Sequence, residues 1–238
     1  MKTIKEIIQP ILSDFKINLD DTAYDRLQKY FEILVDYNSK VNLTAITDVE
    51  GVAIKHFADC LEVFNYVDIK KGAKVIDVGT GAGFPGVVLK IARPDIELYL
   101  LDSLNKRLVF LDTLLNKLGL DAELVHSRAE EGARKAQMRD SFDFAFSRAV
   151  ARLNVLSEYC LPYVKTGGAF VSLKGPDIDE EIKQAQNAFR VLNAKAENVY
   201  KFNLPCDGSQ RSIVVVRKCS STPKQYPRVS AKIKTKPL

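Results

Sequence analysis

The chain has 238 residues, 46% of them hydrophobic and 27% charged, a mix typical of one large globular domain. Its four cysteines are widely separated and it has only two histidines, which indicates neither a disulfide framework nor a metal site. Charged residues interrupt the apolar ones near the N-terminus and no apolar run reaches membrane-spanning length, so we expect a cytoplasmic protein without membrane contact. We also expect a monomer.

Residues 1–66 are predicted to form a helical extension, because apolar residues recur there at the spacing of one buried helical face. Thr22 with Asp25 resembles a capping box, which would begin the second helix. The N-terminal quarter of the chain is therefore expected to be helical.

Residues 67–218 are predicted to form the main domain. Short apolar runs alternate there with helical stretches, a pattern typical of βαβ units in a doubly wound α/β fold with a mainly parallel sheet. The predicted strands lie at about 74–78, 97–101, 122–125, 142–147 and 169–173, the helices at about 86–92, 105–118, 130–137, 153–163 and 179–190, and a closing strand pair at about 197–203 and 211–217.

Residues 219–238 are predicted to be a basic, flexible tail, because proline and lysine dominate them and they have little to bury. The net charge of the chain is +5, and no Asp or Glu follows Asp207, whereas eight Lys and Arg residues do. This pattern favours a polyanion partner, such as RNA, bound through Arg211, Lys224 and Arg228. A solubilising disordered end would have the same composition.

The segment KVIDVGTGAGFPG carries the clearest site motif. An apolar strand ends in Asp77 and leads into Gly79, Gly81 and Gly83, where glycine lets the backbone approach a ligand closely. A helix is predicted to begin at about Pro85, with its free N–H groups facing that ligand. The motif therefore predicts a binding site at the carboxyl edge of the sheet.

Two cofactors compete for this loop. Gly81, Gly83 and Gly86 satisfy the G-x-G-x-x-G pattern of dinucleotide sites, which would suit a nicotinamide-dependent oxidoreductase. Asp77 favours S-adenosylmethionine instead, because a carboxylate suits the ammonium of a methionine moiety better than a pyrophosphate. Asp102 ends the second strand and would accept hydrogen bonds from the ribose hydroxyls of either cofactor.

The chain resembles the bacterial ribosomal RNA small subunit methyltransferase G family, also called glucose-inhibited division protein B. The resemblance is carried by an ordered series of segments: YNSKVNLTAI, KHF with Asp59, DVGTGAGFPG, LLDSLNKRLVFL, SRAE, SRA with Leu153, LKG and YPR. Cys60 departs from it, since the family pattern has serine there.

The resemblance implies a class I, Rossmann-like methyltransferase fold with seven strands. It also implies S-adenosylmethionine-dependent methylation of N7 of guanine 527 in 16S rRNA, either as free RNA or in an assembling small subunit. The implied cofactor contacts are Gly79, Phe84, Asp102, Ala129, Glu130 and Arg148.

Several candidate residues also have plain structural interpretations. His56 and Arg148 are candidates for positioning the substrate. Alternatively, His56 is a core histidine and Arg148 is an ion-pair partner. Asn38 and Asn42 are candidate RNA contacts, or else residues that end a helix and organise the next turn. Lys174 is an RNA contact or surface charge. A non-catalytic RNA-binding protein with a vestigial nucleoside pocket is the remaining alternative.

Overall fold

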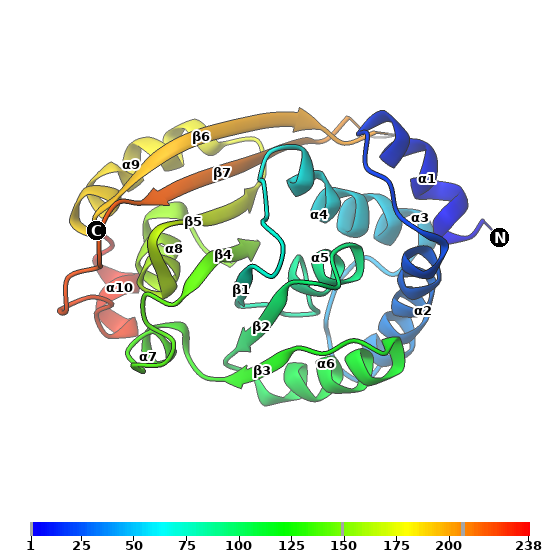
Figure 1. Cartoon of the computed structure of the whole chain (residues 1–238), viewed down its shortest axis with the longest axis horizontal. Coiled ribbons are helices and arrows are strands. Elements are labelled where there is room, and N and C mark those ends of the chain that lie inside the picture. The colour runs from blue at the N-terminus through cyan, green and yellow to red at the C-terminus, as the bar shows by residue number, and fades with distance from the viewer. Residues whose placement is uncertain (1, 149, 206–207) are drawn as a thin grey trace.

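The computed structural model describes residues 2–148, 150–205 and 208–238 (Figure 1). A seven-stranded sheet forms its middle layer, with strands β1 (Lys74–Val78), β2 (Glu97–Asp102), β3 (Glu123–His126), β4 (Phe142–Arg148), β5 (Val164–Lys174), β6 (Ala194–Asn203) and β7 (Gln210–Lys218). Their spatial order is β3-β2-β1-β4-β5-β7-β6. The first five strands are parallel, and β7 runs antiparallel to β5 and β6.

Helices cover both faces of this sheet. One face carries α1 (Ile4–Asp14), α2 (Asp21–Asn38), α3 (Val49–Val52), a π-helix (Ala53–Ala58), α4 (Asp59–Leu61), α5 (Gly86–Ala92) and α6 (Asn105–Leu118). The other face carries α7 (Ala129–Gly132), α8 (Leu153–Cys160), α9 (Ile178–Val191) and α10 (Ser230–Thr235). No helix in the described part of the chain is long and apolar enough to cross a membrane.

Successive side chains along each strand point to opposite faces of the sheet, so each strand contributes to the core on both faces. On β1, Val75 packs with the first helical layer and Ile76 with the second. Helices α1 to α4 and the π-helix share one hydrophobic cluster with the sheet, which includes Ile4 of α1 and Val215 of β7. The extension is thus built into the core, and it brings its residues close to the strand ends.

The predicted order of strands and helices is confirmed, and so is the doubly wound, mainly parallel sheet. The strand order reverses between β1 and β4, where α/β folds bind their ligands. One predicted helix, 130–137, is much shorter than expected, because α7 ends at Gly132.

The predicted capping box at Thr22 and Asp25 is wrong. Helix α2 begins at Asp21, so Thr22 already lies inside it, and the capping side chain is Asp20, which accepts a hydrogen bond from the Ala23 N–H at 2.7 Å. A capping box does occur in the chain, at Thr3 and Glu6 of α1.

Residues 219–238, expected to form a flexible tail, instead pack against the main domain. Ile233 of α10 is fully buried in the core beneath α8, and Arg228 pairs with the buried Glu158. The Arg139 guanidinium donates to the backbone carbonyls of Thr222 and Tyr226. Arg228 thus has its partner far back in the chain, and the composition of the segment carries no sign of that pairing.

Candidate cofactor and substrate site

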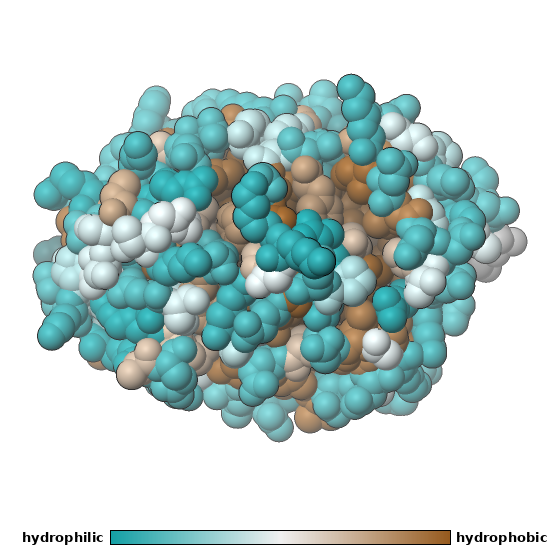
Figure 2. All heavy atoms as spheres, viewed as in Figure 1, coloured by the Kyte–Doolittle hydropathy of each residue, from teal (hydrophilic) through white to brown (hydrophobic). Residues whose placement is uncertain are grey.

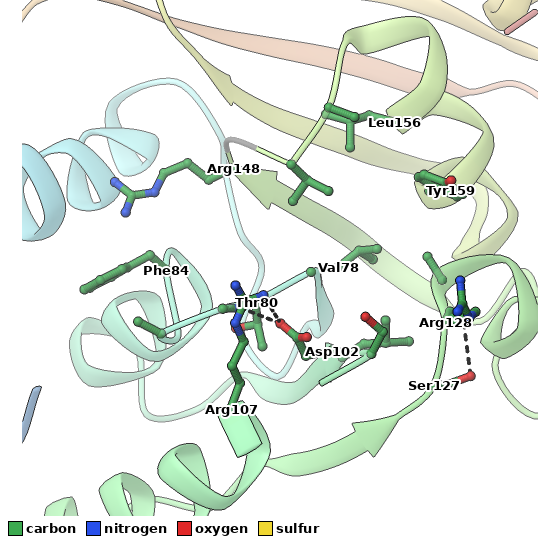
Figure 3. A pocket seen from close by; sticks show the side chains of 18 of the residues that line it. Val78, Thr80, Phe84, Asp102, Arg107, Ser127, Arg128, Arg148, Leu156 and Tyr159 are labelled. Carbon is green, nitrogen blue, oxygen red and sulfur yellow. Dashed lines mark hydrogen bonds and ion pairs between the residues drawn. The ribbon is translucent and has the colours of Figure 1, made fainter. Parts of the chain in front are cut away.

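A cavity of about 740 Å³ opens at the carboxyl ends of the parallel strands, within the usual size range of ligand sites. Hydrophobic residues gather near the middle of the face viewed in Figure 2, and hydrophilic residues surround them. Eight of the predicted site residues line the cavity: His56, Gly79, Gly81, Phe84, Asp102, Ala129, Glu130 and Arg148. Figure 3 shows Phe84 and Arg148 on one side of it, Tyr159 and Arg128 on the other, and Asp102 between them.

The glycine loop follows β1 and forms the floor of the cavity. Gly79 and Gly81 have φ of +74° and +61°, in the left-handed region that favours glycine. A Cβ on Gly79 would lie 2.9 Å from a methyl group of Val150. Gly83 turns away from the cavity, and its Cβ position would meet the Tyr30 hydroxyl and Val87. Gly83 therefore allows the helices to pack and does not line the ligand site.

Asp77 was expected beside the ligand, and the structure places it behind the loop instead. Its side chain is fully buried and absent from the cavity wall. One carboxylate oxygen accepts from the Thr80 hydroxyl at 2.8 Å and from the Gly86 N–H at 2.9 Å. Burial raises the pKa of Asp77 to about 6, against the effect of these hydrogen bonds. Asp77 thus ties the loop to the first turn of α5.

Asp102 ends β2 in the middle of the cavity and is 2% exposed. Its Oδ2 accepts from the Gly81 N–H at 3.0 Å and from Arg107 at 3.2 Å, and its Oδ1 accepts from the Leu104 N–H at 2.9 Å. A carboxylate offers about four acceptor positions, so one position on Oδ1 remains for a ligand hydroxyl. Asp102 links the glycine loop to the loop after β2.

Glu130 and Ala129 lie at the start of α7, at one end of the cavity. Glu130 is 7% exposed, and the Ala129 carbonyl accepts from the Tyr163 hydroxyl at 2.7 Å. Ser230 and Lys234 of α10 line the cavity near them. The C-terminal segment therefore forms part of the wall.

Arg148 and His56 lie at the opposite end, against Phe84. The Arg148 guanidinium donates to Asp59 and to the Lys55 carbonyl, both at 3.1 Å, and lies over the Phe84 ring at 4.9 Å. Its Nη2 is 3.1 Å from Nδ1 of His56. Burial, and then the charge of Arg148, lower the pKa of His56 to about 4, so the imidazole is neutral near pH 7.

Cys60 lies outside this cluster of polar groups. Its side chain is fully buried in the core and does not line the cavity. Burial raises the pKa of its thiol to about 12. The departure from serine at this position therefore leaves the cavity wall unchanged.

The predicted RNA contacts fall into two groups. Arg228, Lys174, Arg211 and Asn38 are engaged inside the protein: Arg228 with Glu158, Lys174 with Glu181 and the Ala151 carbonyl, Arg211 with Asp59, and Asn38 with the turn at Leu43 and Thr44. The Lys174 side chain is only 9% exposed. Asn42 and Lys224 are exposed. Asn38 thus ends α2 and organises the next turn, and Arg148 pairs with Asp59 and also lines the cavity.

Sequence reasoning missed several residues that help to build the site. Thr44 lines the cavity and contacts His56, Tyr30 of α2 donates to the Ala82 carbonyl at 2.5 Å, and Ser230 and Lys234 line the far wall. Thr44 stands in the quoted segment YNSKVNLTAI, which was a usable signal. The other contacts join segments that are distant in the chain, so no local pattern reveals them.

The model of the family described as rRNA small subunit methyltransferase G matches residues 23–214. The chain belongs to this family. It is 44% identical over 238 residues to the ribosomal RNA small subunit methyltransferase G of Clostridium novyi, covering all of this chain and 98% of that protein. It is 46% identical over 223 residues to the protein of the same name from Clostridium perfringens strain 13, covering 93% of each.

The fold is also that of solved methyltransferase structures. A crystal structure from Bacillus halodurans, assigned as a methyltransferase, superposes with a TM-score of 0.54 at 14% identity, covering 68% of this chain and all of that one. Similarity at this level concerns the fold alone. The sheet is therefore that of a class I, Rossmann-like methyltransferase.

Proposed function

We propose that this protein transfers a methyl group from S-adenosylmethionine to N7 of a single guanine of 16S rRNA, at position 527 in the usual numbering. The observation that carries the proposal is one continuous cavity, lined by the glycine loop and Asp102 and reaching from Glu130 to Arg148. Membership of the rRNA small subunit methyltransferase G family supports it. A nicotinamide cofactor is supported by the spacing of Gly81, Gly83 and Gly86, but Gly83 faces Tyr30 and Val87 and does not line the cavity.

The residues present fit S-adenosylmethionine. The open acceptor position on Asp102 suits a ribose hydroxyl, and the small residues Gly79 and Gly81 leave room for the ligand above the loop. Among the residues that line the cavity, Glu130 and Ala129 would contact the adenine end, and Arg148 and Phe84 would lie where the methionine end meets the substrate. The enclosed Asp77 acts only by shaping the loop.

S-adenosylmethionine, when bound, supplies an electrophilic methyl group on a sulfonium. Guanine N7 has a free lone pair at neutral pH, which would form the new bond to the methyl carbon as the sulfur–methyl bond breaks and its electron pair returns to sulfur, and no proton leaves the base. The protein therefore has to align the base and exclude water, and it needs no general base. This agrees with the site, where His56 is neutral and its Nδ1 faces the Arg148 guanidinium.

The RNA is proposed to reach the cavity as free 16S rRNA or within an assembling small subunit, with the protein acting as a monomer. A target base of this kind would be unpaired and would turn into the protein, since single-stranded bases are the usual targets of specific RNA recognition. The C-terminal segment has three exposed lysines, Lys232, Lys234 and Lys236, of which Lys234 lines the cavity, and they would face its phosphates.

The test is methylation of 16S rRNA in vitro, naked and in small-subunit particles, followed by cleavage chemistry specific for N7-methylguanine. We expect one modified guanine. Methyl transfer to another atom, or no transfer to either substrate, would contradict the proposal. Calorimetry with S-adenosylmethionine and with NAD tests the cofactor separately.

A pair of glycine variants gives a matched control. Gly79→Val adds a side chain where a Cβ already lies 2.9 Å from Val150, and it should abolish cofactor binding. Gly72→Val suffers the same left-handed backbone strain, since Gly72 has φ +70°, but a Cβ there would contact nothing. It should bind the cofactor as the parent does.

A further inference from the structure

The end of the cavity near Arg148 also contains the hydroxyl group of Thr44, 2.9 Å from Nε2 of His56. We propose that this hydroxyl, on Thr44, donates a hydrogen bond to O6 of the acceptor guanine and so selects guanine over bases that lack O6. The inference rests on the proposed function, because it assigns a role at the substrate end of the same site.

Thr44 reaches the cavity from the segment after α2. Its Oγ1 lies 2.9 Å from Nε2 of His56 and accepts a hydrogen bond from the Ile46 N–H at 3.1 Å. Thr44 lines the cavity together with Leu43, Phe84 and Arg148. The hydroxyl is thus held between two nitrogen atoms at the cavity surface.

The tautomer of His56 decides what the Thr44 hydroxyl can do. Nδ1 of His56 lies 3.1 Å from the Arg148 Nη2, and a guanidinium can only donate. Nδ1 therefore carries the lone pair, and the single ring hydrogen is on Nε2, where it points at Thr44. The Lys55 carbonyl is also 3.0 Å from Nδ1 and would favour the other tautomer, but in that tautomer the Nδ1 hydrogen would face the N–H of the Arg148 guanidinium. The interaction of Nδ1 with the charged Arg148 guanidinium outweighs a hydrogen bond to the neutral Lys55 carbonyl.

With this tautomer, both lone pairs of the Thr44 oxygen are occupied. A hydroxyl has two acceptor positions and one hydrogen, and the N–H groups of Ile46 and His56 fill the two acceptor positions. The hydrogen is left for the cavity, which Thr44 lines. Thr44 is therefore a donor toward any ligand at this end.

Asn38 fixes the backbone that carries this donor. Its side-chain oxygen accepts from the N–H groups of Leu43 and Thr44 at 2.8 and 3.0 Å, and its amide donates to the Thr44 carbonyl at 3.0 Å. Both sides of the Thr44 peptide are thereby held. Asn38 is a positioning residue, and the Thr44 hydroxyl does not have to be ordered when substrate arrives.

The chemistry of this donor matches guanine. O6 lies next to N7 on the same edge of guanine and accepts hydrogen bonds, whereas adenine has an amino donor at that place. A donor facing the amino group of adenine would leave both groups unsatisfied. A neutral hydroxyl also draws less electron density from N7 than a cationic donor would, and the neutral His56 adds no charge beside the purine, which becomes positive on methylation.

The test compares two 16S substrates that differ only at the target base, guanine or 2-aminopurine. The second base keeps N7 and the 2-amino group but has hydrogen in place of O6. For the parent we expect kcat/KM to favour guanine by roughly 5- to 150-fold, the effect of an unsatisfied buried donor. In Thr44→Val this preference should collapse toward unity, and in Thr44→Ser it should persist. Thr113→Val removes a hydroxyl of α6 that lies outside the cavity and donates to the Val109 carbonyl, and it should leave the preference unchanged.

Two results would overturn different conclusions. A parent that makes no N7-methylguanine refutes the proposed function itself. A parent that makes it, with the same preference for guanine in Thr44→Val, refutes the role of Thr44. Calorimetry of cofactor binding shows whether the valine variant is folded. Thr44→Ala also removes the hydroxyl without adding bulk, and its preference between guanine and 2-aminopurine is compared with that of the parent in the same way.

Discussion

Arg228 and Glu158 form an ion pair in which every oxygen of the carboxylate is used. The Glu158 side chain is fully buried in α8, and its Oε1 accepts from both the backbone N–H and Nε of Arg228, at 2.7 and 2.9 Å. Its Oε2 accepts from Nη2 at 2.7 Å. The pair anchors the C-terminal segment and thereby places Ser230 and Lys234 at the cavity wall.

Removing Arg228 should destabilise the whole protein. Arg228→Ala leaves a buried carboxylate unpaired, which costs about 3 to 5 kcal/mol of unfolding free energy. Urea unfolding monitored by circular dichroism measures this change. Lys224→Ala serves as the control, since this exposed lysine should matter by less than about 0.5 kcal/mol. Equal stability of the two variants would show that the ion pair contributes little.

Exposed lysines of the C-terminal segment should add salt-dependent attraction to RNA. We expect glutamine at Lys224, Lys232, Lys234 and Lys236 together to weaken binding and to flatten its dependence on salt. Each lost phosphate contact should reduce the log-log slope by about 0.7 to 0.9. Fluorescence anisotropy at several salt concentrations measures it, and an unchanged slope would mean that the segment does not contact RNA. Truncation after Lys218 is a poorer test, because it also uncovers Glu158 and the site of Ile233.

Asp102→Ala should weaken binding of S-adenosylmethionine. The substitution removes the acceptor for the ribose and also releases the N–H groups of Gly81 and Leu104. Loss of a charged hydrogen-bond partner corresponds to about 1.5 to 3 kcal/mol, roughly 10- to 150-fold in affinity. Calorimetry measures it, with the exposed Asp112→Ala on α6 as the control. Unchanged affinity in Asp102→Ala would show that this carboxylate does not hold the cofactor.

The rate of the chemical step should hardly change between about pH 6.5 and 8.5. The pKa of His56 is lowered to about 4 by burial and by Arg148, so His56 stays neutral in that range, and Asp77, whose pKa burial raises to about 6, lies behind the loop and does not line the cavity. Single-turnover rates with saturating cofactor and RNA measure this. His126→Gln should behave as the parent does, since His126 is exposed on β3 and lies outside the cavity. A rate that rises tenfold per pH unit would instead indicate a general base.

His56 should make the folded protein sensitive to acid. Its folded pKa of about 4 lies below the ordinary value of 6.5, so the unfolded chain binds this proton first as the pH falls. Stability is therefore lost between pH 6.5 and 4, and His56→Gln should lose less of it. Asp77 acts in the opposite direction, because burial raises its pKa to about 6 and the folded state holds its proton more tightly. Urea unfolding at pH 7.5 and 5 should show a larger loss in Asp77→Asn than in the parent, and parallel losses in all three proteins would contradict both assignments.

The strands and the central carboxylate were predictable because their signals are local. An apolar run ending in an acid defines β2 and Asp102, and a glycine-rich turn defines the floor of the cavity. The direction of the Asp77 side chain was not predictable, since motif spacing is the same whether the carboxylate faces the ligand or the Gly86 N–H.

The partners of Arg228 and Lys174 were not predictable either, because they are distant in the chain. Arg228 and Lys174 look alike in the sequence whether they are solvated or paired, and only the fold brings Arg228 to Glu158 or Lys174 to the Ala151 carbonyl. The family segment YNSKVNLTAI pointed to the right region, but the hydroxyl of Thr44 acquires its direction from His56, which the fold brings beside it.

The position of β7 has a consequence for how the chain folds as it is synthesised. Strand β6 is made first but pairs only with β7, which lies between β5 and β6 in the sheet. Until residues 210–218 leave the ribosome, β6 has no paired strand, and its alternating, largely polar sequence disfavours aggregation through its exposed edge. The sheet is therefore completed when β7 inserts between β5 and β6, and not by the addition of a strand at its edge. The domain stays incomplete during synthesis until shortly before the final helix emerges.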